Sequence, residues 1–138
     1  SCTGGFLASK ITDNESGSSE IFKFGLVTYS NEFKIKNGIN PDTIEKYTVY
    51  SNEVSIEMAK QASNIADSNW GIGITGQIGK IDLENPGSKP NIVYYSIFNK
   101  DNDVCNSYEI HCDDDFTKKE KKEIIVLEVM QNFLNMLK

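Results

Sequence analysis

The chain has 138 residues, a net charge of −6 and 38% hydrophobic residues, which suits one compact domain with its own core. The acidic balance argues against nucleic acid as a partner, and the longest apolar run is too short to cross a bilayer. Three cysteines, Cys2, Cys105 and Cys112, show no disulfide-framework spacing, so we expect a cytoplasmic protein.

Glycine, proline and small polar residues divide the first fifty residues into short elements. The run from Phe24 to Tyr29 is apolar and has the length of a strand. We expect a loop from Asp13 to Ser18 and short helices from Gly4 to Thr12, from Ser19 to Phe22, from Ser30 to Lys36 and from Pro41 onward.

The rest of the chain predicts two longer helices around three strands. Apolar residues recur at helical spacing from Ser51 to Ala66, and the capping box Thr117-Lys118-Lys119-Glu120 opens a last helix that runs to Lys138. We expect strands at Trp70–Thr75, Asn91–Phe98 and Val104–Cys112, with a long polar loop from Gly76 to Pro90. Helices alternating with strands predict an α/β fold: a three-layer α/β/α sandwich with a mixed, mainly parallel sheet.

Gly71, Gly73 and Gly76 spell G-x-G-x-x-G, the dinucleotide-binding pattern, but two of them fall inside the apolar strand rather than after it. No amphipathic helix follows Gly76. We interpret these glycines as positions where a helix packs closely over the strand.

Few residues are suited to a metal site or to a histidine triad. Cys105, His111 and Cys112 lack a C-x-x-C pair, and adjacent strand residues point to opposite faces, so we expect no metal. His111 is the single histidine, and we favour a structural or exposed role for it. All 14 basic residues are lysines, and we expect the run of lysines at Lys118–Lys122 to be a solvated helix face.

Three motifs point to a family. The chain opens with Ser1-Cys2-Thr3-Gly4-Gly5, continues with Gly17-Ser18-Ser19, and then reads G-L-V-T-Y-S-N-E-F-K over residues 25–34. Taken alone, the first five residues would be a flexible chain end. Together the motifs resemble the C-terminal domain of the CinA (competence/damage-inducible) family, whose members act as nicotinamide-nucleotide amidases. The resemblance implies one such domain over residues 1–138, lacking the helix and strand that precede S-C-T-G-G in the family.

The resemblance also implies a site that hydrolyses a carboxamide with a serine and a lysine. Ser19 would be the nucleophile, Lys34 the general base and Tyr29 a hydroxyl that orients the pair. From the residues alone, Lys34 would be a surface lysine of a helix, although Ser-Lys variants of the catalytic triad exist. By the same resemblance, the substrate would contact Ser1, Thr3, Gly4, Gly5, Thr75 and Gly76.

The implied reaction converts nicotinamide mononucleotide to nicotinate mononucleotide and ammonia without a cofactor. The substrate partner is therefore a small pyridine nucleotide. The broad apolar surface of the last helix, together with the resemblance, predicts a homodimer or larger assembly. The chain departs from the family pattern at Ile78 and Ile92, and it has no arginine near Asp113 to Thr117. The alternative is a catalytically degenerate member that binds a nucleotide or a protein.

Overall fold

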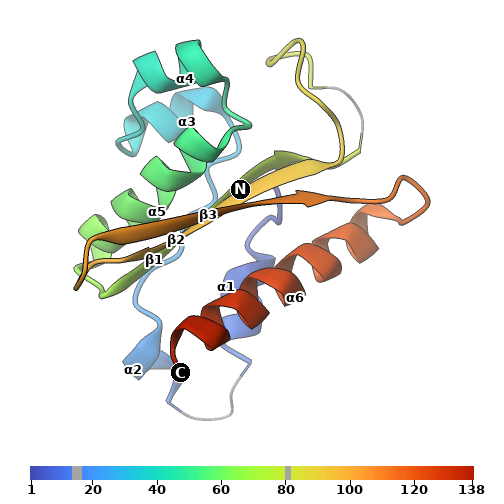
Figure 1. The fold of residues 1–138 in the computed structure, drawn as a ribbon. Helices are drawn as coiled ribbons and strands as arrows, with labels where there is room; N and C mark the ends of the chain where they lie inside the picture. The colour runs from blue at the N-terminus through green and yellow to red at the C-terminus, as the bar shows by residue number, and fades with distance from the viewer. Residues whose placement is uncertain (14–16, 80–81) are drawn as a thin grey trace.

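The computed structural model describes residues 1–13, 17–79 and 82–138, so the middle of the predicted Asp13–Ser18 loop lies outside it. Within these residues the fold is α/β, with helices on both sides of one sheet (Figure 1). The elements in chain order are α1 (Phe6–Ile11), α2 (Ser18–Ile21), α3 (Asn31–Lys36), α4 (Pro41–Tyr47), α5 (Asn52–Ala66), β1 (Trp70–Gln77), β2 (Ile92–Asn99), β3 (Val104–His111) and α6 (Lys118–Met136).

The described sheet is antiparallel, so the prediction of a mainly parallel sheet was wrong. Its order is β1-β2-β3, and each strand pairs antiparallel with the next. A parallel pair would need a crossover, usually a helix, between its strands. Here a loop joins β1 to β2, a tight turn joins β2 to β3, and the long helices come before β1 and after β3.

The two faces of the sheet are covered by different helices. Side chains toward α6 form the main core, and they pack with Ile125 and Val129 of that helix. The opposite face receives α5, whose Ser55 hydroxyl lies 2.6 Å from that of Ser96 in β2. Glycine alternates with isoleucine from Gly71 to Ile74 in β1, and this period of two assigns each side chain to one face.

Two of the three glycines in β1 allow α5 to approach closely, as expected from the sequence. A Cβ at Gly71 would lie 2.0 Å from the Ala59 carbonyl oxygen, and one at Gly73 would lie 2.3 Å from that of Ser55. At Gly76 the obstacle is strand β2, where Val93 Cα would lie 2.7 Å away. The glycine pattern therefore serves close packing around β1.

Replacing Gly71 with alanine is expected to destabilise the fold by about 1–3 kcal/mol, because the added methyl group meets backbone that cannot rotate away. Urea unfolding measures this cost. Val104→Ala is the control, since Val104 is 45% exposed at the sheet edge and its truncation should change stability by less than about 0.5 kcal/mol. Equal stability of the two variants would contradict the packing account.

Local capping signals in the sequence account for the helix starts. Ser30, Ser51 and Thr117 each accept a hydrogen bond from a backbone N–H in the first turn of the helix that follows. The capping box at Thr117 and Glu120 is complete, as predicted. These caps confirm the predicted starts of α3, α5 and α6.

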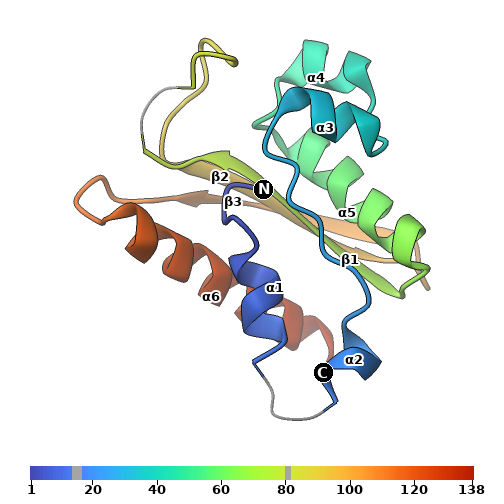
Figure 2. The same cartoon turned by 180° about the vertical axis from the view of Figure 1, so that it is seen from behind.

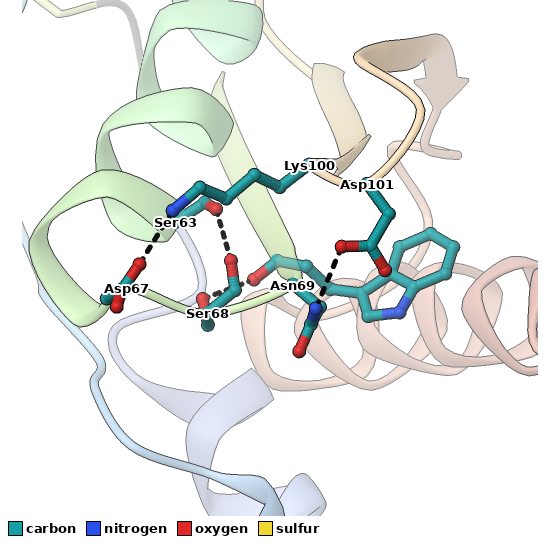
Figure 3. Close-up of polar contacts among 7 residues, drawn as sticks. Ser63, Asp67, Ser68, Asn69, Lys100 and Asp101 are labelled. Carbon is teal, nitrogen blue, oxygen red and sulfur yellow. Dashed lines mark hydrogen bonds and ion pairs between the residues drawn. The ribbon is translucent and has the colours of Figure 1, made fainter.

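Polar contacts tie the end of α5 to the turn between β2 and β3 (Figure 3). Lys100 Nζ lies 2.7 Å from Asp67 Oδ1, and Asn69 Nδ2 donates to Asp101 Oδ1 at 3.0 Å. Ser63 Oγ donates to the Ser68 carbonyl at 2.6 Å. These contacts fix the end of α5 to the end of the sheet where β1 begins and β2 turns into β3 (Figure 3).

Residues 22–29 run extended from α2 to α3 but pair with no strand among the described residues (Figure 2). The prediction of a strand from Phe24 to Tyr29 is therefore wrong, because the segment is extended but joins no sheet in the described part of the chain. A cavity of about 690 Å³ is lined by this segment on one side and by residues of β1, such as Ile72 and Ile74, on the other. Strand patterning in a sequence indicates an extended conformation, whereas a ladder requires a partner edge within bonding distance.

Candidate functional site

Lys34 is buried, although it lies in a six-residue helix that a sequence reading would place on the surface. Its side chain is 1% exposed, and Nζ donates a hydrogen bond to the Thr28 carbonyl oxygen at 2.6 Å. The Ser30 cap starts α3 so that its second turn carries Lys34 inward. Burial lowers the pKa of this amine, and an amine with a lowered pKa is the kind of group that serves as a general base.

The start of the chain lies against the same region. Ser1 and Lys34 line the same cavity, together with Thr28. The Tyr29 hydroxyl donates to the Cys2 carbonyl at 3.5 Å, and the Ser1 nitrogen donates to the Ile74 carbonyl of β1 at 2.7 Å. The structure thus brings together three predicted site residues, Ser1, Tyr29 and Lys34, from two separate motifs.

Ser1 also lines a second, smaller cavity of about 360 Å³. This cavity is bordered by Tyr29, Tyr50 and Gly76, and by the acidic side chains of Asp82 and Glu84. Its size falls within the range of small-ligand sites. Ser1 is therefore placed where the apolar cavity beside β1 meets a polar cavity beside the loop after β1.

A polar network holds that loop against the site. The Tyr50 hydroxyl donates to Asp82 at 2.5 Å, and Asn85 Nδ2 donates to the same carboxylate at 2.9 Å. Asn31, at the start of α3, donates to Asn85 Oδ1 at 3.0 Å. The hydrogen bond from Tyr50 is the main cause that lowers the pKa of Asp82, so its carboxylate stays ionised beside the cavity.

Burial lowers the pKa of Lys34, while the charges of Cys2, Glu84 and Asp82 act in the opposite direction. Glu32 and Lys36 lie within two residues of Lys34 in the sequence, but neither is a cause of this shift. Glu32 instead forms an exposed ion pair with Lys36 at 2.9 Å. The acidic residues that face Lys34 come from a loop about fifty positions downstream, which no local pattern indicates.

Ser19 does not join this cluster within one chain. It is exposed in α2, beside the C-terminal end of α6, whereas α3 with Lys34 lies at the other end of the fold (Figures 1 and 2). The extended residues 22–29 span the distance between the two helices. The expectation that Ser19 lies within hydrogen-bond reach of Lys34 is therefore wrong for a single copy of the chain.

The other residues predicted to contact the substrate differ in where they lie. Thr3 and Gly5 line the larger cavity, and Gly76 lines the smaller one. Thr75 lines neither, because it is fully buried and its hydroxyl donates to the Val49 carbonyl at 2.9 Å. That bond joins β1 to the residues before α5, so Thr75 supports the site without facing it. Gly4, with φ of 61°, lies beside Lys122 of α6.

Three further observations concern metal ligands, the histidine and membrane-spanning helices. Among the described residues, no group of three or more His, Cys, Asp or Glu side chains is placed to hold a metal ion. His111 is exposed on β3, with Nε2 3.0 Å from Glu109. Within residues 1–13, 17–79 and 82–138, no helix has the length and apolar character needed to cross a membrane.

The fold and this lysine site define a small α/β domain of a recognised class. The sequence profile of the CinA C-terminal domain matches residues 1–137, and the chain belongs to this family. A competence-damage inducible protein of Alkaliphilus oremlandii is 50% identical over 80 residues, which cover 57% of this chain and 19% of that protein. One from Clostridium kluyveri is 43% identical over 101 residues, covering 72% of this chain and 24% of the relative.

Solved structures share the fold over almost the whole chain. The competence or damage-inducible protein from Enterobacter asburiae matches with a TM-score of 0.90 and 25% identity, covering 100% of this chain and 84% of that one. The CinA superfamily protein from Escherichia coli matches with a TM-score of 0.87 and 26% identity, covering 99% and 76%. The chain spans less than a quarter of the length of the curated relatives described above.

Proposed function

We propose that this domain is an amidohydrolase that converts nicotinamide mononucleotide to nicotinate mononucleotide and ammonia. The observation that carries the proposal is the buried amine of Lys34, which lines the same cavity as the Ser1 side chain. Family membership supports it, because the resemblance of the motifs implies this activity. The polar cavity beside Ser1 has room for a small ligand.

In the proposed mechanism Ser1, rather than Ser19, is the nucleophile. Neutral Lys34 accepts the hydroxyl proton as Ser1 Oγ attacks the carboxamide carbon, and the protonated lysine then donates a proton to the leaving ammonia. Water hydrolyses the resulting ester with the same lysine as base and releases the carboxylate. Tyr29, whose hydroxyl donates to the Cys2 carbonyl, positions the start of the chain beside the base.

A second arrangement keeps Ser19 as the nucleophile and requires a second copy of the chain. In it, α2 of one copy would reach Lys34 of the other. Leu127 and Leu134 of α6, and Leu137 just after it, are at least half exposed, which supports a homo-oligomer. Ile125 and Val129 of α6 belong to the chain's own core. We favour the first arrangement because it needs residues of one copy only.

Ammonia release from nicotinamide mononucleotide tests the proposal. The assay should compare this chain with one extended upstream of Ser1, since the family resemblance implies a helix and a strand before the S-C-T-G-G motif. We expect turnover in the extended chain at least. No ammonia from either protein, with the fold verified by circular dichroism, would overturn the proposal.

The rate should rise with pH through the pKa of Lys34, because only the neutral amine accepts the serine proton. Glu84→Gln removes a negative charge that favours the ammonium, so the rising limb should move to lower pH. Glu32→Gln is the control, because Glu32 pairs with Lys36 and its loss should leave the limb in place. Profiles of kcat/KM that coincide for the Glu84 variant and the parent would contradict lysine as the base.

The second candidate function is a degenerate member that binds a nucleotide without turning it over. Ile78 borders the polar cavity at a position where the family pattern has a small residue, and the chain contains no arginine. Binding of nicotinamide mononucleotide without ammonia release would favour this candidate.

A further inference from the structure

We propose that Lys118 and Lys122 of α6 form the anion-binding end of the site and hold the phosphate group of the ligand. The inference rests on the proposed function, which supplies the pyridine ring and carboxamide of the ligand. What it adds is that two lysines recognise a phosphate monoester. The sequence had suggested that these lysines belong to a solvated helix face. In the structure Lys118 is exposed and also borders the polar cavity, and Lys122 is half-buried.

The first support is position. Lys118 borders the polar cavity together with Ser1 and Tyr29. Lys122 follows one helical turn later, and residues four apart lie on the same side of a helix. Its Nζ lies 3.4 Å from the point that a Cβ at Gly4 would occupy, so it rests against the turn that follows Ser1 and Cys2. The two amines therefore flank the start of the chain.

The second support is the lack of an ion partner. Within the described residues, neither Lys118 nor Lys122 forms an ion pair, whereas Lys10, Lys36 and Lys100 each pair with a carboxylate. Lys122 is half-buried, so its charge is only partly compensated by water. Burial raises the pKa of the Cys2 thiol, and the charges of Lys34 and Lys122 both oppose that rise, which places both amines near Cys2.

The third support is the distribution of charge around the cavity. Asp82 and Glu84 supply negative charge on the side that faces Lys34. A phosphate group would be repelled there, whereas the positively charged pyridinium ring of a nucleotide would be favoured. The ligand would then lie with its ring and carboxamide toward Ser1 and Lys34, and with its phosphate toward α6. Because the chain has no arginine, lysine is the available cationic side chain for this contact.

The test measures the affinities of nicotinamide mononucleotide and of its dephosphorylated nucleoside by calorimetry, for the parent chain and for Lys118→Gln and Lys122→Gln. A hydrogen bond to a charged group contributes about tenfold or more in affinity, so the nucleotide-to-nucleoside affinity ratio should fall about tenfold in each variant. Lys119→Gln is the matched control, since Lys119 is exposed on the same turn, and its ratio should equal the parent's.

Binding and turnover separate this inference from the proposed function. A ratio that falls in the Lys118 and Lys122 variants supports the inference even if no ammonia is released. Turnover with an unchanged ratio in both variants, or the same fall in the Lys119 variant, overturns the inference and leaves the amidase proposal standing. Lys122 lies close to Gly4, so thermal melting is measured for each variant to detect a loss of packing. Lys118 is exposed, so the affinity ratio of the Lys118→Gln variant is independent of such a loss.

Discussion

Replacing Lys34 with methionine is expected to lower kcat by at least about a thousandfold while the domain stays folded. Methionine fills a similar apolar volume but can neither accept the serine proton nor donate one to the leaving ammonia. Water cannot take over the proton transfer at this position, because Lys34 is only 1% exposed. Steady-state ammonia release measures kcat, and circular dichroism measures the melting temperature.

Lys36→Met is the matched control for this variant. Lys36 lies two residues further along the same short helix, and it is exposed and paired with Glu32. The same chemical change there should leave kcat within about twofold of the parent, as expected for a surface substitution away from the site. Full activity in the Lys34 variant would exclude Lys34 as the base.

Replacing Ser1 with alanine is expected to remove turnover to a similar extent, because residues that act as one catalytic unit do not contribute additively. The Ser1 side chain makes only a long contact of 3.5 Å to the Ile74 carbonyl, so its removal should not unfold the chain. The Ser1→Ala, Lys34→Met double variant should be no slower than either single variant. Ammonia release under saturating substrate gives the comparison.

Ser19→Ala separates the two proposed arrangements. Ser19 is exposed in α2 and distant from Lys34 in the same chain, so this variant should retain ordinary turnover. Loss of turnover in Ser19→Ala together with full activity in Ser1→Ala would instead assign the nucleophile to a second copy. In that case light scattering should detect an oligomer at the assay concentration.

Much of the fold follows from local sequence signals, because helix caps act over three or four residues. Ser51 and the pair Thr117 and Glu120 therefore indicated helix starts correctly. Strand partners depend on contacts that no short pattern contains. The extended segment from Phe24 to Tyr29 shows this limit, as does the antiparallel order of the sheet.

The candidate site was predictable only where a motif could be matched to a family. Lys34 and Tyr29 were proposed in that way, but nothing local distinguishes the buried Lys34 from the exposed Lys36. The acidic residues Asp82 and Glu84 reach the site through a long loop that Tyr50 holds in place. Such a contribution depends on tertiary structure, and so does the failure of Ser19 to approach Lys34.

Trapping the covalent intermediate tests whether Ser1 is the nucleophile. The protein is mixed with nicotinamide mononucleotide, quenched in acid within the first turnover and cleaved after lysine. Cleavage after Lys10 and Lys23 separates Ser1 from Ser19, since they fall in residues 1–10 and 11–23. Mass spectrometry should find the acyl group as an ester on the first peptide, with fragmentation assigning it to Ser1 rather than Ser9. An ester on the second peptide, or product formed with no ester on either, would contradict the account.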